Sequence, residues 1–160
     1  MTQLFTSFPA LAFVDIETTG GNAERDRVTE VAVVSYADGQ VQRWSRLVNP
    51  ATRIPSFIQS LTGISDDMQL SAKLFVAHNA RFDYGFLRAE FKRAGLDYSA
   101  RVLCTVKLSR KLFPLQARHN LDSVVAAHGL NVSNRHRAMS DADALLQSWR
   151  HLESTQSTAT

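Results

Sequence analysis

Four carboxylates stand at the edges of expected secondary-structure elements. Asp15 and Glu17 follow the apolar run 11–14 and are two positions apart, so on a strand both side chains point to the same face. Asp83 and Asp141 each lie at the expected start of a helix, five residues after a histidine. Neighbouring carboxylates repel each other unless a proton or a cation lies between them. The four side chains are therefore candidate ligands for hard cations such as Mg²⁺ or Mn²⁺, which prefer oxygen donors.

Two such cations about 4 Å apart can clamp an in-line displacement at phosphorus, one activating the attacking water and one stabilising the leaving oxygen. The water must lose a proton, and His136 is the candidate general base because imidazole titrates near neutral pH. Arg135 and Arg137 flank it in a polar segment, close to where phosphates would bind. Each residue also has a structural interpretation: an Asp in a first helical turn is stabilised by the helix dipole, and a loop histidine is commonly only solvated. The hypothesis therefore depends on the whole constellation.

The elements that must position these residues follow from hydrophobic periodicity and turn signals. Residues 11–17, 28–36 and 41–48 are expected to form an antiparallel meander, with Asp38-Gly39 as its hairpin turn. Strands and helices then alternate, with helices at 55–61, from about 82, 106–113, 121–128 and 141–152, and strands at 74–77 and 101–105. This order predicts an α/β fold, a mixed sheet flanked by helices. We expect one domain over 1–153 and a disordered tail over 154–160, which contains only Ser, Thr, Gln and Ala.

Composition limits the class of protein. The net charge is +3, but residues 81–137 carry 11 Lys and Arg against 4 Asp and Glu. That segment is either a surface for a polyanion or an ordinary set of solvated basic faces. No apolar run approaches the roughly 20 residues that span a bilayer, residues 1–8 do not resemble a secretory signal, and the lone Cys104 fits a reducing compartment. We therefore expect a cytoplasmic protein without a membrane contact.

Three motifs occur in order along the chain. Asp15 to Gly20 reads Asp-Ile-Glu-Thr-Thr-Gly, His78 to Asp83 reads His-Asn-Ala-Arg-Phe-Asp, and His136 to Asp141 reads His-Arg-Ala-Met-Ser-Asp. Together they resemble the DEDDh (DnaQ-like) 3′–5′ exonucleases, and the member they look most like is the proofreading (epsilon) subunit of bacterial DNA polymerase III. The resemblance spans about residues 10–150. It implies a ribonuclease H-like sheet of three antiparallel strands plus parallel strands, and release of nucleoside monophosphates from a 3′ end.

The resemblance also implies a role for individual residues. Two Mg²⁺ or Mn²⁺ ions would be held by Asp15, Glu17, Asp83 and Asp141, with His136 as the base. The histidine at position 136 implies the His branch of the family, since a sister branch has tyrosine there. Residues that would lie against or support the terminal nucleotide are Thr18, Thr19, His78, Asn79 and Phe82.

The expected substrate is nucleic acid with a free 3′ end, preferably single-stranded DNA. An alternative is RNA, as in ribonuclease T and oligoribonuclease, which share these motifs. A third hypothesis, from another class, is a non-catalytic nucleic-acid-binding module, which the basic segment 81–137 and the short connection 65–77 support.

The sequence departs from the family pattern in two places. Family members usually have a further helix before the His-Asn-Ala strand, where this chain has only the connection 65–77. We hypothesise an omitted segment there, which an intact mass of 17.8 kDa would rule out. Residues 156–160 lack the glutamine and apolar cluster of a sliding-clamp binder, so the tail does not support an association with a polymerase or clamp.

Overall fold

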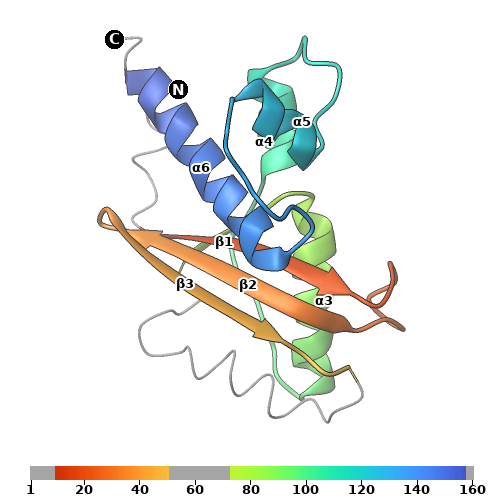
Figure 1. The fold of residues 1–160 in the computed structure, drawn as a ribbon. Helices are drawn as coiled ribbons and strands as arrows, with labels where there is room; N and C mark the ends of the chain where they lie inside the picture. The colour runs from red at the N-terminus through yellow and green to blue at the C-terminus, as the bar shows by residue number, and fades with distance from the viewer. Residues whose placement is uncertain (1–9, 51–72, 158–160) are drawn as a thin grey trace.

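The computed structural model describes residues 10–50 and 73–157 (Figure 1). Its elements, in chain order, are β1 (Ala10–Thr18), β2 (Val28–Ala37), β3 (Gln40–Leu47), β4 (Leu74–Ala77), α3 (Ala80–Arg93), β5 (Val102–Cys104), α4 (Thr105–Leu112), α5 (Leu121–Ala127) and α6 (Ala138–Ser157). None of the helices in these two ranges is long and apolar enough to cross a membrane.

The strands form one mixed sheet in the order β3-β2-β1-β4-β5. β1 pairs antiparallel with β2, and β2 pairs antiparallel with β3. β4 and β5 add to the other side of β1 in parallel. The expected hairpin is confirmed: Asp38 and Gly39 both have positive φ, at 50° and 76°, which is the backbone twist that a two-residue hairpin requires. The predicted meander and mixed sheet are therefore confirmed.

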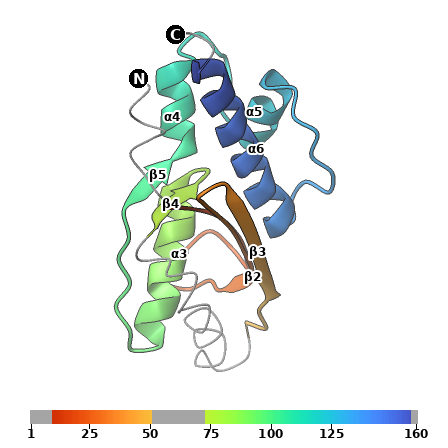
Figure 2. The ribbon, with the colours of Figure 1, turned by 90° about the vertical axis from the view of Figure 1, so that its left-hand side faces the viewer.

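Helices cover both faces of the sheet, which explains why β1 is apolar on both faces (Figure 2). Even-numbered residues of β1, such as Val14, pack against α3, whereas Phe13 faces α6 and meets Trp149 edge to face at 6.1 Å. Side chains alternate along a strand. Asp15 and Glu17 therefore point to the face that α6 covers, at the carboxyl end of the central strand.

The last helix is longer than expected at both ends. It begins at Ala138 rather than residue 141, since the amide of Asp141 already donates to the carbonyl of Arg137 at 3.0 Å. It continues to Ser157, so the expected disorder is wrong for residues 154–157. The hydroxyls of Ser154 and Thr155 donate to carbonyls three residues earlier, at 2.8 and 3.1 Å, so both side chains find hydrogen-bond partners inside the helix.

Three expectations concern segments outside the described residues. These are the helix over 55–61, most of the connection 65–77, and the end of the tail at 158–160. The extent of the single domain, 1–153, stays a prediction.

A buried carboxylate on α3 fastens that helix to the start of β2. Glu90 is only 1% exposed and accepts hydrogen bonds from Arg27 Nε at 2.9 Å, Arg27 Nη2 at 3.1 Å and the Val28 amide at 3.2 Å. Arg93 Nη1 lies 3.2 Å from the same carboxylate. Since Arg27 directly follows the loop that continues β1, this cluster holds that loop beside the carboxyl end of β1.

Glu90→Ala is expected to lower the free energy of unfolding by about 3 kcal/mol, because it leaves two guanidinium groups and a buried amide without their acceptor. Urea denaturation measures the effect. Glu24→Ala, at an exposed loop position, is the control and should stay within about 0.5 kcal/mol of the unmutated protein. Equal stability of the two variants would show that the Glu90 cluster does not hold the fold.

Candidate active site

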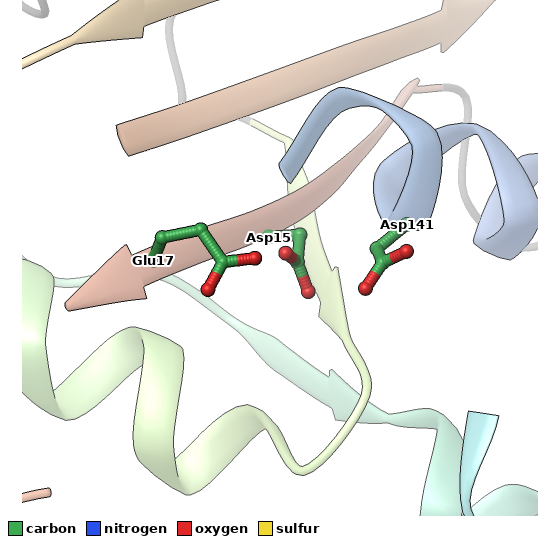
Figure 3. Close-up of side chains that lie close together, drawn as sticks. All are labelled: Asp15, Glu17 and Asp141. Carbon is green, nitrogen blue, oxygen red and sulfur yellow. The ribbon is translucent and has the colours of Figure 1, made fainter. Parts of the chain in front are cut away.

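Three of the four predicted carboxylates come together at the end of β1. Ligand oxygens of Asp15, Glu17 and Asp141 all lie within 4.8 Å of one another. Figure 3 shows Asp15 and Glu17 on the strand and Asp141 on the facing helix, with their carboxylates turned toward the same space. The strand supplies two ligands by its alternation, and the first turn of α6 supplies the third. Residues 126 positions apart in the chain are thus brought within the reach of one cation.

Asp83 lies beside this group rather than within it. It comes from the first turn of α3 and is only 3% exposed, and the backbone amides of Asp83 itself and of Ile16 on β1 partly offset the effect of burial on its pKa. Its charge nevertheless raises the pKa of Asp15, which places the two carboxylates close together. The fourth predicted ligand therefore approaches the cluster from the helix on the opposite face of the sheet.

The carboxyl groups raise one another's pKa. Burial, followed by the charges of Asp83 and Glu17, raises the pKa of Asp15 to about 8. Burial raises the pKa of Asp83 to about 7, and burial together with Glu30 raises that of Glu17. Ionised carboxylates held this way need a compensating cation, and all-oxygen donors suit Mg²⁺ or Mn²⁺. The donor set therefore fits a divalent metal.

These pKa values predict that metal affinity rises with pH. At pH 6 the groups with pKa values of about 8 and about 7 still hold protons, which a cation must displace. Between pH 6 and 8 the affinity for Mn²⁺ should rise by up to about tenfold per pH unit for each displaced proton. Calorimetric titration with Mn²⁺ across this range provides the measurement.

Thermal unfolding gives a second measurement of the same effect. A raised carboxyl pKa favours the folded state at low pH, and this contribution is lost as the pH rises through the folded-state value. The rise in melting temperature on adding Mn²⁺, relative to EDTA, should therefore be larger at pH 8 than at pH 6. Asp15→Asn should weaken this dependence, and an affinity that is flat with pH in the unmutated protein would contradict the assignment.

Arg135 is a member of the site whose contacts sequence reasoning missed. Its Nη1 bonds to Asp141 Oδ1, and its Nε lies 2.8 Å from Asp122 Oδ1 at the start of α5. The guanidinium also lowers the pKa of Asp15. In the sequence it was only a basic neighbour of a histidine, and nothing there indicated that α5 would bring Asp122 to it.

His136 lies at the rim of the carboxylate group. Its side chain is exposed, and its amide donates to Asp141 Oδ1 at 3.3 Å. Its charge lowers the pKa of Glu17, so the imidazole is close to that carboxylate. The residue has φ of 66°, in the left-handed region that few residues other than glycine adopt. The predicted base is thus next to the predicted ligands, on an unusual backbone conformation.

The two threonines after β1 shape the loop that follows it. Thr18 Oγ1 donates to the carbonyl of Gly20 at 2.6 Å, and Thr19 exchanges two hydrogen bonds with Arg27, at 2.9 and 3.0 Å. Gly20 allows a close approach here, because a Cβ at this position would lie 2.5 Å from the carboxylate of Asp26. The loop therefore folds back on itself beside Glu17.

The remaining predicted substrate-binding residues lie in two different surroundings. His78 turns toward α4, where Nδ1 lies 2.8 Å from Thr105 Oγ1, and burial lowers its pKa to about 4. Asn79 and Phe82 instead line an open hollow of about 240 Å³ together with Gly21, Ala23, Arg81, Gly85 and Phe86. The structure thus separates the histidine from the two residues that neighbour it in the motif.

The RNase_T family model, described as Exonuclease, matches residues 12–75 and 69–148. The 3′–5′ exonuclease DinG of Bacillus subtilis is 36% identical over 149 residues, which is 81% of this chain but 16% of DinG. The PolC-type DNA polymerase III of Staphylococcus saprophyticus is 33% identical over 148 residues, which is 81% of this chain and 10% of the polymerase. The chain therefore spans a small part of these relatives.

Solved structures share the fold. The zinc-bound form of the complex between E. coli ExoI and single-stranded DNA has a TM-score of 0.77 and 17% identity, over 93% of this chain and 41% of ExoI. At this identity the likeness concerns the fold, and it confirms the expected ribonuclease H-like sheet with flanking helices.

Proposed function

Since this chain belongs to the RNase_T family of exonucleases, we propose that it is a metal-dependent 3′–5′ exonuclease that hydrolyses phosphodiester bonds at the 3′ end of single-stranded DNA. The observation that supports it most is the meeting of Asp15, Glu17 and Asp141, whose ligand oxygens lie within 4.8 Å of one another. Single-stranded DNA is the proposed substrate because structures of similar fold are ExoI complexes with DNA oligonucleotides.

In this proposal four carboxylates act as metal ligands and one histidine acts as the general base. Asp15, Glu17, Asp83 and Asp141 would hold two Mg²⁺ or Mn²⁺ ions. When bound, such ions supply an activated water and charge stabilisation at the leaving oxygen. His136, exposed at the rim and close to Glu17, takes the proton from the attacking water and can pass it to solvent.

The 3′-terminal nucleotide would lie across the loop after β1. Thr18 and Thr19 line that loop, and the hollow beside Asn79 and Phe82 offers an aromatic wall for a base. His78, which directly follows β4, would support this arrangement through its bond to Thr105 on α4. The products would be nucleoside monophosphates, and trimming of 3′ ends in DNA proofreading or repair is the proposed role. The lone free Cys104 fits the reducing cytoplasm as the site of that role.

A labelled oligomer tests the proposal. Single-stranded DNA carrying a label at its 5′ end is incubated with the protein in Mg²⁺, in Mn²⁺ and in EDTA, beside Asp15→Ala. A ladder that shortens one nucleotide at a time, only with metal and only with the unmutated protein, is the expected result. If the DNA stays intact while RNA of the same sequence is shortened, the substrate is RNA rather than DNA. Binding that persists in EDTA without cleavage of either would make the protein a binding module and end the enzyme proposal.

A further inference from the structure

A charged pair outside the ligand group connects β2 to the segment that carries His136. Arg137 Nε donates to Glu30 Oε2 at 3.2 Å, and Nη2 donates to Oε1 at 3.3 Å, so the guanidinium grips the carboxylate with two nitrogens. Glu30 is 8% exposed and is the one charged residue of β2. It stands opposite Glu17 in the pairing of β1 with β2. The pair therefore lies directly beside the candidate metal ligands.

Arg137 is also held through its backbone. Its carbonyl accepts the amide of Asp141 at 3.0 Å, which closes the first turn of α6. His136, the residue before it, has φ of 66° and donates its amide to Asp141 Oδ1 at 3.3 Å. A left-handed backbone at a residue with a side chain persists only where the surroundings hold it. Arg137 can restrain the backbone of His136, because it is attached to α6 by its main chain and to β2 by its side chain.

We propose that Glu30 and Arg137 are positioning residues, whose two-nitrogen ion pair fixes the backbone of His136 and so keeps the imidazole over the carboxylate group. The inference rests on the proposed function, in which His136 is the base. A histidine on an exposed polar segment samples many positions, and a small displacement of a catalytic group lowers the rate strongly. Anchoring its neighbour to the sheet restricts that motion.

The charges around the pair agree with this role. Glu30 contributes to raising the pKa of both Glu17 and Asp15, whereas Arg137 lowers that of Glu17. The positive charge of Arg137 therefore offsets the negative charge of Glu30, a fifth carboxylate beside the four proposed ligands. Both oxygens of Glu30 accept from Arg137, so Glu30 serves the anchor rather than the proposed metal set.

Steady-state kinetics on single-stranded DNA at saturating Mn²⁺ tests the coupling. Arg137→Gln and Glu30→Gln should each lower kcat by about 10- to 100-fold with little change in KM. If Arg137 acts through Glu30, the double variant should be no slower than the slower single variant. The matched control is Arg43→Gln, which breaks the ion pair that Arg43 Nε on β3 makes with Asp143 Oδ1 on α6 at 2.8 Å, and should keep the kcat of the unmutated protein.

Other kinetic outcomes would overturn the proposal. Losses that multiply in the double variant would show that the two residues act independently. A higher KM and a shallower salt dependence for Arg137→Gln, with kcat unchanged, would show that Arg137 binds a phosphate of the substrate instead.

Hydrogen exchange provides a readout that does not depend on catalysis. Amides of residues 131–139 should exchange faster in Arg137→Gln and in Glu30→Gln than in the unmutated protein, and Arg43→Gln should not change them. Unchanged exchange in the first two variants would exclude the anchor even if their rates fell. If the unmutated protein cleaves neither DNA nor RNA, the proposed function fails, whereas the exchange result still decides whether the pair anchors the segment.

Discussion

Asp15→Asn is expected to abolish turnover of single-stranded DNA, even at saturating Mg²⁺. Asp15 is within 4.8 Å of both Glu17 and Asp141, and Asp83 is the charge that contributes most to raising its pKa. It is thus the carboxylate that all the other proposed ligands surround. Asparagine has nearly the same shape but one charged oxygen fewer, so the variant should fold normally and bind cations weakly.

Stability distinguishes this loss from misfolding. Because the pKa of Asp15 is raised to about 8, its ionised form costs stability when no metal is bound, and this cost grows as the pH rises toward that value. The Asn variant should therefore melt in EDTA at pH 8 no lower than the unmutated protein. Mn²⁺ should raise its melting temperature less.

Asp143→Asn is the matched control for Asp15→Asn. Asp143 also lies in the first turns of α6, but its carboxylate pairs with Arg43 on β3 rather than with the ligand group. This variant should retain full activity. Substantial metal-dependent turnover by Asp15→Asn would show that the carboxylate group is not the catalytic centre.

His136→Ala is expected to lower the rate of the chemical step by roughly 10²- to 10⁴-fold, the usual contribution of a general base. The imidazole lies close to Glu17 but belongs to none of the ligand positions, so affinity for Mn²⁺ should change little. Single-turnover cleavage measures the rate, and calorimetry measures the affinity. A rate that recovers as the pH is raised, where hydroxide replaces the missing base, would further support the role.

His151→Ala serves as the control for His136→Ala. His151 lies on the last turns of α6, where its ring stacks on that of His128 at 4.8 Å. It should leave the rate of cleavage unchanged. If His136→Ala cleaves as fast as the unmutated protein, His136 is not the general base, and the proposed metal site is unaffected.

Local signals were sufficient to predict most of the elements and their order. The Asp38-Gly39 turn requires two positive φ angles, a signal that acts within a few residues of the chain. Period-two alternation likewise placed Asp15 and Glu17 on one face before any packing was known. Composition was a poorer guide at residues 154–157, because hydroxyl side chains that bond to the preceding turn can stay helical.

The chain's sequence therefore indicated the candidate ligands, the candidate base and the mixed sheet through properties of single elements: alternation, turn chemistry and ordered motifs. Tertiary packing decided which side chains meet. Arg137 reaches Glu30 across 107 positions, and Arg135 bridges α5 to Asp141. Tertiary packing also turned His78 toward Thr105, whereas Asn79 and Phe82 face an open hollow. Periodicity tells which face of an element is apolar, but the partner of a charged side chain depends on how separate elements dock, which is set by the core they bury together.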